Sequence, residues 1–110
     1  MEIQKKEINA TGVKLYVEQN GYEVARTYLY LLTNDLHDRP FGLMEDVFVI
    51  EPLRGQGYGS KLVETLVEEA KVRGYYKLIC TSRHTKPEVH ELYEILGFKN
   101  HGLEFRMDLE

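Results

Sequence analysis

The first third of the chain alternates apolar and polar residues in the manner of β-strands. Every second residue of Val13 to Glu18 is apolar, and the segment Tyr22 to Leu32 is rich in residues that favour strands. Asn20 and Gly21 lie between these segments, and both tolerate the positive φ angles that a type I′ turn requires. The pattern predicts an antiparallel hairpin.

A third strand and a helix are predicted in the middle of the chain. Turn-forming residues fill 34–42 and indicate a surface loop, after which Leu43 to Ile50 is typical of a largely buried strand. From Tyr58 the apolar period becomes that of a helix, and Gly74 supplies its end. The apolar face of this helix comprises Leu62, Val63, Leu66, Val67 and Ala70.

The last third predicts a strand, a helix and a strand. The first strand is expected over Tyr76 to Thr81. Thr85 and Glu88 fit a capping box, in which Thr85 is the N-cap of a second helix that Gly97 ends. Alternation over Leu103 to Leu109 predicts a final strand.

This order predicts an α/β (α+β) fold with a mixed, mostly antiparallel central sheet and two main helices. Strand 43–50, the helix from 57 and strand 76–81 form a βαβ unit, so these two strands should be parallel, with a right-handed crossover. The length of 110 residues suits a single domain over 1–110.

Composition narrows the classes of function. No apolar run reaches the roughly 20 residues that span a bilayer, and the formal charge of −4 disfavours nucleic acid as a partner. We therefore expect no membrane and no nucleic-acid role. The N-terminal residues do not resemble a secretory signal, and the single cysteine, Cys80, fits a reducing compartment, so the expected location is cytoplasmic. The histidines show no metal-ligand spacing, and no metal is expected.

Three glycines alternate in Arg54-Gly55-Gln56-Gly57-Tyr58-Gly59, between the buried strand and the first helix. Glycine lets backbone amides approach a ligand closely, and the free amides of a helix start favour a phosphate. The spacing matches neither a Walker A loop nor the dinucleotide fingerprint. Two interpretations stay open: a diphosphate site, or a tight turn that only packs the helix.

Two blocks of the sequence resemble the GNAT superfamily of N-acetyltransferases. Arg54-x-x-Gly57-x-Gly59 resembles its acetyl-CoA signature, within a block from Val47 to Leu62 that is similar throughout. Leu92-Tyr93-Glu94-Ile95-Leu96-Gly97-Phe98 is similar to a second block of the family. The resemblance covers about Leu43 to Met107 and implies a GNAT-like fold whose βαβ unit binds acetyl-CoA.

The resemblance also implies which residues hold the cofactor. The amides from Gly55 to Ser60 would hold the pyrophosphate, with Arg54 beside the phosphates, and the strand edge at Val47 to Val49 would bind the pantetheine arm in a gap where two strands splay apart. The residues expected to bind acetyl-CoA are Val47, Phe48, Val49, Arg54, Gly55, Gln56, Gly57, Tyr58, Gly59 and Ser60.

Direct attack of an amine on a thioester needs a base, an oxyanion donor and an acid for the thiolate. Tyr93 resembles the family's acid, and the amide of Val49 is expected to donate to the carbonyl oxygen. Glu45 resembles an acidic residue that acts as the base in some members of the family, and Asp46 is the fallback or a substrate-binding residue. Strand alternation should send the two carboxylates to opposite faces, so only one of them can face a given pocket. Nucleophilic catalysis by Cys80 is not expected.

Members of the family usually carry two helices between their first two strands. Here only Glu7 to Gly12 separates a possible first strand from Val13, so we expect a short form that lacks those helices. Its acceptor side would be open, walled by loop 34–42, or completed by a second subunit, and we expect a homodimer.

The resulting hypothesis is an N-acetyltransferase that moves acetyl from acetyl-CoA to a primary amine of a small molecule, such as a polyamine or an amino sugar. Two alternatives stay open. One is acetylation of a protein N-terminus or lysine, and the other is a non-catalytic module that binds acyl-CoA.

Overall fold

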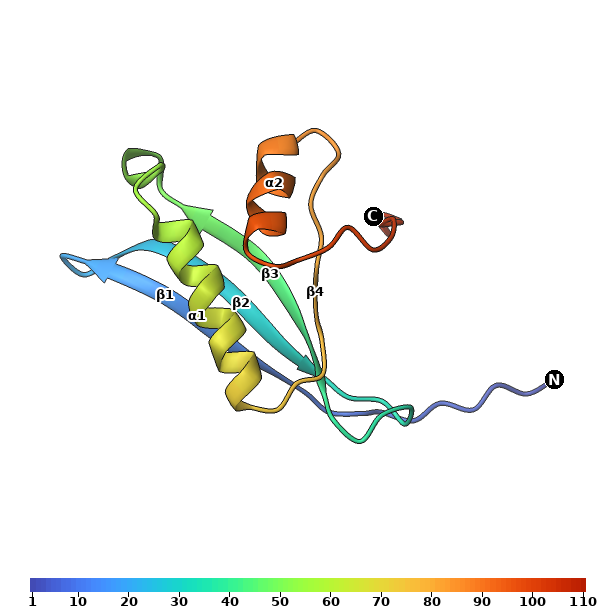
Figure 1. The fold of residues 1–110 in the computed structure, drawn as a ribbon. Coiled ribbons are helices and arrows are strands. Elements are labelled where there is room, and N and C mark those ends of the chain that lie inside the picture. The colour runs from blue at the N-terminus through green and yellow to red at the C-terminus, as the bar shows by residue number, and fades with distance from the viewer. The chain divides into compact units, whose positions relative to one another are not determined.

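The computed structural model describes all residues, 1–110, as two compact units, Met1–Cys80 and Thr81–Glu110, which are described separately below. The first unit holds four strands and one α-helix (Figure 1). Its elements are β1 (Ala10–Gln19), β2 (Tyr22–Leu32), β3 (Phe41–Val49), a 3-10 helix (Glu51–Leu53), α1 (Tyr58–Val72) and β4 (Leu78–Cys80). The second unit contains α2 (Pro87–Ile95).

The four strands form one sheet in the order β1-β2-β3-β4. The predicted hairpin is confirmed: β1 and β2 pair antiparallel, and their turn has φ angles of 54° at Asn20 and 81° at Gly21. Residues 1–9 form neither helix nor strand, so the possible strand before Glu7 is absent. β3 begins at Phe41, two residues before the predicted start at Leu43, so the predicted loop 34–42 ends earlier, at Pro40, at the opposite end of β3 from Val49.

The predicted βαβ unit is also confirmed, because β3 and β4 pair in parallel. Their contact is short and covers only Gly42 with Leu78 to Met44 with Cys80. The strand predicted over Tyr76 to Thr81 is therefore shorter than expected, and β3 continues well beyond the end of its partner.

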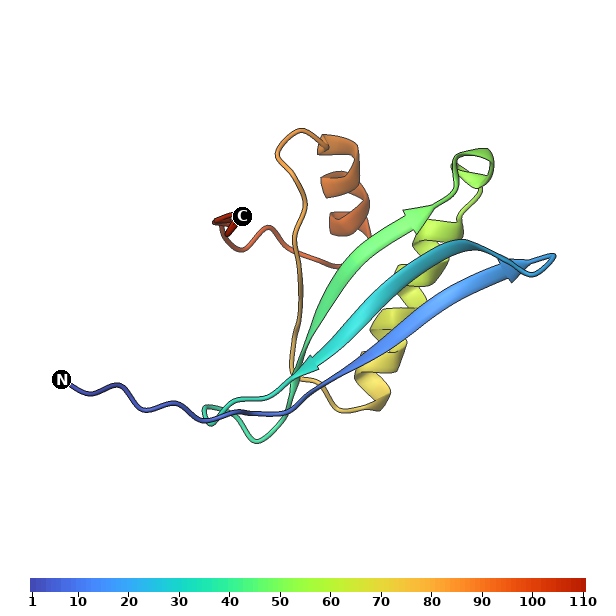
Figure 2. The same cartoon turned by 180° about the vertical axis from the view of Figure 1, so that it is seen from behind.

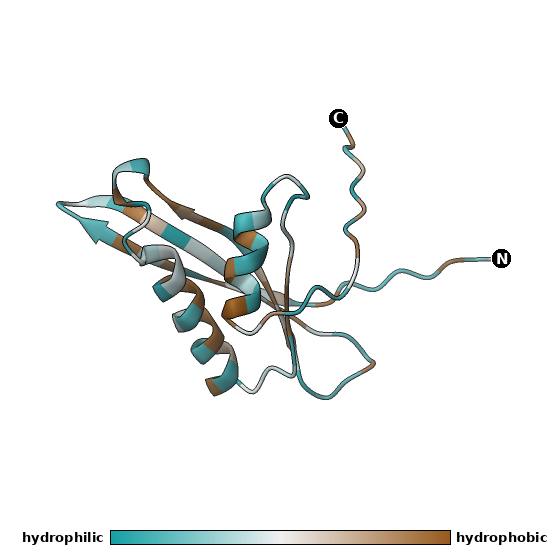
Figure 3. Cartoon of the chain, turned by 45° about the horizontal axis from the view of Figure 1, so that its top comes forward, coloured by the Kyte–Doolittle hydropathy of each residue, from teal (hydrophilic) through white to brown (hydrophobic).

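The core of the first unit lies between α1 and one face of the sheet. Figures 1 and 2 show α1 lying along that face, while no other element of this unit covers the opposite face. Apolar and polar residues succeed one another along α1, as its amphipathic pattern predicts (Figure 3). The buried apolar side chains are Val24, Ala25, Leu29, Met44, Leu62, Val63, Leu66 and Ala70. None of the helices combines the length and apolar composition that crossing a membrane requires.

The capping box predicted for α2 is wrong. Lys86 is the N-cap, with φ −123° and ψ 65°, and no side chain caps the helix start. Proline fits the first helical position but pushes the residue before it out of the helical region, so the helix begins at Pro87 and Thr85 lies outside it. Gly97, with φ 103°, follows the helix end as predicted.

The final strand predicted over Leu103 to Leu109 is also wrong, because residues 98–110 form no helix or strand. Leu103 and Phe105 are 73% and 89% exposed. Alternation states which residues a strand would bury, but a strand also needs a neighbour to take its backbone hydrogen bonds.

Candidate functional site

The glycine-rich turn joins β3 to α1 through backbone conformations that favour glycine. Gly55 has φ 77°, and Gly57, the N-cap of α1, has φ 89°. Side chains with a Cβ adopt such angles at a cost, whereas glycine does not. The turn therefore depends on glycine at these two positions for backbone reasons.

The space beside these glycines is open. A Cβ added at Gly55 or Gly57 would meet no atom within 4 Å, and one at Gly59 would only touch Val49 Cγ2 at 4.0 Å. The first amides of α1 have no carbonyl partner inside the helix and lie at the positive end of its dipole. The interpretation as a mere packing turn loses support, because no neighbouring element crowds Gly55 or Gly57.

Side chains tie the turn to the sheet. Arg54 Nε donates a hydrogen bond to the Val49 carbonyl oxygen at 2.9 Å, and its guanidinium lies 5.7 Å from the centroid of the Phe48 ring. Gln19 Nε2, at the end of β1, donates to the Tyr58 hydroxyl at 2.7 Å. The side chains of Arg54 and Tyr58 thus brace the turn, while the space beside Gly55 and Gly57 stays open.

The last part of β3 has one unpaired edge. Its pairing with β4 ends at Met44, while its pairing with β2 continues to Val49. Ile50 N donates to Val24 O at 2.9 Å, so the alternation of an antiparallel ladder turns the N–H of the preceding Val49 away from β2. The amide of Val49 therefore lies on the free edge, directly before the glycine turn.

The structure corrects the prediction that Glu45 and Asp46 face opposite sides of the sheet. Asp46 has φ 57°, and the register between β2 and β3 shifts at this point, which marks a β-bulge. Glu45 lies opposite Tyr28, and Asp46 Oδ2 accepts a hydrogen bond from Arg26 Nε at 2.8 Å. Because Arg26 and Tyr28 are two residues apart on one strand, both carboxylates lie on the face that α1 leaves uncovered.

The two carboxylates differ in their surroundings. Arg26 bridges Asp46 and Glu23, and Lys14 pairs with the other side of Glu23. The hydrogen bond to Asp46 is the main cause that raises the pKa of Arg26, and the hydrogen bond from Lys14 is the main cause that lowers the pKa of Glu23. The exposed carboxylate of Glu45 forms no ion pair or hydrogen bond, so it is the unpaired one of the two carboxylates.

Cys80 ends β4, and burial raises the pKa of its thiol to about 11. A thiol with such a pKa stays protonated at neutral pH, and the thiolate is the nucleophilic form. The environment of Cys80 thus agrees with the expectation that it is not a nucleophile.

Tyr93 lies on α2, in the second unit, where it is half-buried. Its ring centroid is 5.7 Å from that of Phe98, and Phe98 N donates to Tyr93 O at 2.9 Å. These contacts join the helix to the residues that follow Gly97. The catalytic role of Tyr93 stays a prediction.

The structure brings most of the predicted site residues together on one stretch of the first unit. Glu45 to Val49 form the end of β3, and Arg54 to Ser60 form the turn and the start of α1. Sequence reasoning missed Arg26 and Thr27 on β2, which contact the bulge. The one available signal was Thr27 itself, a hydroxyl within a strand face that is otherwise apolar.

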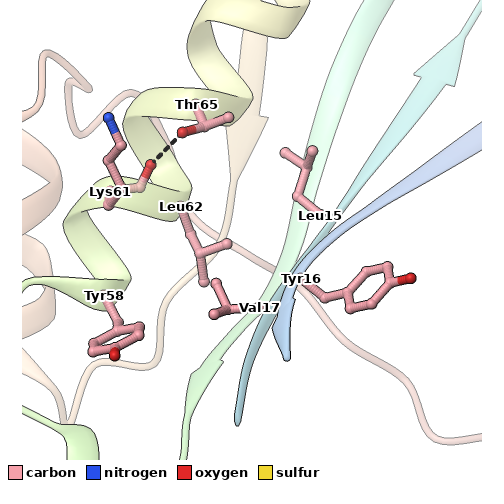
Figure 4. Close-up of a pocket in the computed structure, with 7 residues that line it drawn as sticks. All are labelled: Leu15, Tyr16, Val17, Tyr58, Lys61, Leu62 and Thr65. Atoms are coloured by element: carbon pink, nitrogen blue, oxygen red, sulfur yellow. Dashed lines mark hydrogen bonds between the residues drawn. The ribbon is translucent and has the colours of Figure 1, made fainter. Parts of the chain in front are cut away.

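A separate apolar groove of about 280 Å³ lies between β1 and α1. Figure 4 shows Val17 of β1 and Leu62 of α1 pointing toward one another across it, while Tyr16 points away. β1 is an edge strand, so this groove lies beside backbone groups that no further strand of the sheet pairs. Tyr58 lines the groove and also begins α1 at the glycine turn.

Several solved structures with this fold are acetyltransferases. An acetyltransferase from Trypanosoma brucei has a TM-score of 0.79 and 31% sequence identity, over 89% of this chain and 69% of that one. Glucosamine-6-phosphate N-acetyltransferase from Arabidopsis thaliana also has a TM-score of 0.79, with 25% identity over 90% and 67% of the two chains. The predicted GNAT-like fold is thereby confirmed.

Sequence comparison also finds acetyltransferases. Glucosamine 6-phosphate N-acetyltransferase of Trypanosoma brucei brucei is 38% identical over 71 residues, which are 64% of this chain and 46% of that protein. The chain thus spans less than half the length of this relative. The model of the acetyltransferase (GNAT) family matches residues 3–98. The chain therefore belongs to the GNAT family of acetyltransferases.

Proposed function

We propose that the chain transfers an acetyl group from acetyl-CoA to a primary amine of a small molecule. The observation that carries this proposal is the open glycine turn at the start of α1, which directly follows the free edge of β3. A diphosphate suits the turn, and an extended amide-containing arm suits a strand edge with unpaired backbone groups.

The cofactor residues are proposed as follows. The amides from Gly55 to Ser60 bind the pyrophosphate, and the positions of Gly55 and Gly57 fit it because the space beside them is open. Arg54 adds positive charge at the turn while its Nε holds the end of β3. The edge Val47 to Val49 binds the pantetheine arm through its backbone.

Bound acetyl-CoA supplies a thioester carbonyl as the electrophile. Glu45 removes a proton from the attacking ammonium, so that the free amine forms the new N–C bond. The amide of Val49 donates to the carbonyl oxygen as negative charge develops on it. When the C–S bond breaks, Tyr93 gives its proton to the departing thiolate. The attacking nitrogen loses its second proton as the amide forms, this proton restores Tyr93, and the proton held by Glu45 returns to solvent.

For the acceptor, we propose an amino sugar phosphate. The relatives from Trypanosoma brucei brucei and from Oryza sativa subsp. japonica are named glucosamine 6-phosphate N-acetyltransferases, and the latter is 44% identical over 59 residues. The uncovered sheet face carries Glu45 beside the cations Lys14 and Arg26. Such a face offers a carboxylate for the amine, while Lys14 and Arg26 are themselves paired with Glu23 and Asp46.

We also propose that the protein is a cytoplasmic homodimer. The groove beside edge strand β1 supports a partner copy, since it leaves Val17 only half-buried next to unpaired backbone groups. The single cysteine supports a reducing compartment. Sedimentation equilibrium tests the dimer, and a monomer at all concentrations up to the millimolar range would contradict it.

The deciding experiment measures release of free thiol from acetyl-CoA with a panel of acceptors: glucosamine, glucosamine 6-phosphate, spermidine and a short lysine-containing peptide. We expect the highest kcat/KM for glucosamine 6-phosphate. Calorimetric titration with CoA is run on the same preparation.

Three other results would overturn parts of the proposal. Turnover of the peptide alone would make the protein a peptide acetyltransferase. Tight CoA binding without turnover of any amine would leave a non-catalytic binding module. Absence of CoA binding would overturn the assignment of the glycine turn.

A further inference from the structure

The bulge at Glu45 and Asp46 is held by two neighbouring residues of β2 from opposite faces of the sheet. On the uncovered face, Arg26 Nε donates to Asp46 Oδ2 at 2.8 Å. On the face that packs against α1, Thr27 Oγ1 donates to the carbonyl oxygen of Glu45 at 3.1 Å. Successive strand residues point to opposite faces, so adjacent positions can grip one bulge from both sides.

Each of the two contacts stabilises a different feature of the bulge. Asp46 has φ 57°, a conformation that side chains other than glycine adopt at a cost, so it persists only where its surroundings hold it. Where the register slips, the Glu45 carbonyl oxygen falls opposite Thr27, the one buried polar residue of the core, which is 0% exposed. A buried hydroxyl must find a partner, and this carbonyl provides it.

The bulge determines on which face of the sheet the side chains of the rest of β3 lie, and on which edge its N–H groups lie. It brings Glu45 and Asp46 onto one face and neutralises Asp46 against Arg26, which leaves Glu45 as the free carboxylate. It also resets the alternation of the following residues, so that Val49 reaches the glycine turn with its N–H on the free edge. A change in the conformation of the bulge would therefore move both the Glu45 carboxylate and the free edge of β3 at Val49.

We propose that Arg26 and Thr27 are positioning residues for acetyl transfer. Together they form a clamp, here called the β2 clamp, that fixes the bulge of β3 and thereby the relation between the Glu45 carboxylate and the Val49 amide. This inference rests on the proposed function, but the clamp itself concerns only the shape of β3. It acts through backbone position, and neither residue touches the reacting atoms.

Hydrogen exchange of the free protein tests the clamp without any turnover. We expect amides in 44–50 to exchange at least about tenfold faster in Thr27→Val and in Arg26→Gln than in the wild type, because each change removes one hydrogen bond at the bulge. The conservative variant Thr27→Ser keeps the hydroxyl and should restore exchange to within about threefold of the wild type. The amides of α1 serve as the internal reference for global destabilisation.

Activity gives the second readout, with the acceptor that the wild type uses best. We expect kcat to fall about tenfold to hundredfold in Thr27→Val, with less than about threefold change in KM, because small displacements of reacting groups mainly slow the chemical step. The double variant Arg26→Gln/Thr27→Val should lose less kcat than the product of the losses in the two single variants. Both contacts hold one bulge, so the second change has less left to disturb.

The outcomes separate the clamp from the function. Exchange in 44–50 that does not change in Thr27→Val, or that rises equally in Thr27→Ser, would overturn the clamp. Exchange that rises as much in α1 as in 44–50 would also overturn it and leave Thr27 a packing residue. A wild type without turnover would overturn the proposed function, while the exchange measurement would still decide the clamp.

Discussion

Arg54 Nε donates a hydrogen bond of 2.9 Å to the carbonyl oxygen of Val49, which joins the residue that opens the glycine turn to the last residue of β3. The N–H of the same Val49 lies on the free edge of the strand. Val49 thus connects the strand edge to the glycine turn. A ligand that binds both would meet them at a fixed distance and orientation.

Replacing Arg54 by Met should weaken CoA binding about tenfold, because the variant loses a charged donor to the end of β3 and positive charge at the turn. Calorimetry measures the affinity at low and high salt, and the loss should shrink as salt screens the charge. Arg73→Met, at the other end of α1 where Arg73 pairs with Glu69, is the matched control. An equal loss in both variants would contradict a local role of Arg54.

The variant Gly57→Ala should lose CoA binding by more than about tenfold, because its Cβ enters the open space beside the turn. The positive φ alone should cost about 1–2 kcal/mol of stability. Gly21→Ala in the hairpin turn has a similar φ, 81°, and equally open surroundings, so it carries the backbone cost without the site. Urea unfolding and calorimetry on both variants separate the two effects, and parallel losses of binding would argue against the turn as the phosphate site.

Replacing Glu45 by Gln should lower kcat about hundredfold, the usual contribution of a general base. Asp46→Asn should lower kcat less than Glu45→Gln does, because Asp46 is already paired with Arg26 and the variant weakens only the support of the bulge. Steady-state kcat at saturating acceptor checks the assignment, and it should fall at least about tenfold further in Glu45→Gln than in Asp46→Asn. The reverse pattern would make Asp46 the base.

The variant Tyr93→Phe should lower kcat about hundredfold, with little change in CoA affinity, because it removes the proposed proton donor to the thiolate and keeps the ring that contacts Phe98. Tyr22→Phe, on an exposed side chain of the hairpin, is the control and should keep full activity. Thiol release and calorimetry measure the two quantities. Full activity of Tyr93→Phe would leave the tyrosine a packing residue.

Cys80 should react slowly with iodoacetamide at neutral pH, about a hundredfold more slowly than an unhindered cysteine, since its pKa of about 11 lies above the ordinary 9.0. Its folded pKa is raised, so the unfolded chain ionises first. The thiol therefore lowers stability as pH rises from about 9 to about 11, and has no such effect below 9. Urea unfolding of wild type and Cys80→Ala across this window checks the prediction, and kcat should not change in Cys80→Ala.

Local patterns determined much of this protein. The Asn20-Gly21 hairpin, the apolar stripe of α1 and the glycines of the turn follow from residue geometry over short distances, and the family blocks around Gly57 and Tyr93 followed from sequence similarity. Patterns failed where a partner decides the outcome. The alternating residues after Leu103 form no strand, because alternation cannot supply a neighbouring strand.

Only the tertiary structure decided how the two carboxylates of β3 are arranged. Alternation by itself separated Glu45 from Asp46, whereas the bulge places both on one face, where Asp46 is paired with Arg26 and Glu45 is free. The contacts that hold this bulge come from β2, 18 and 20 residues away in the sequence. The bulge depends on hydrogen bonds from a neighbouring strand, so the local sequence of β3 alone does not predict it.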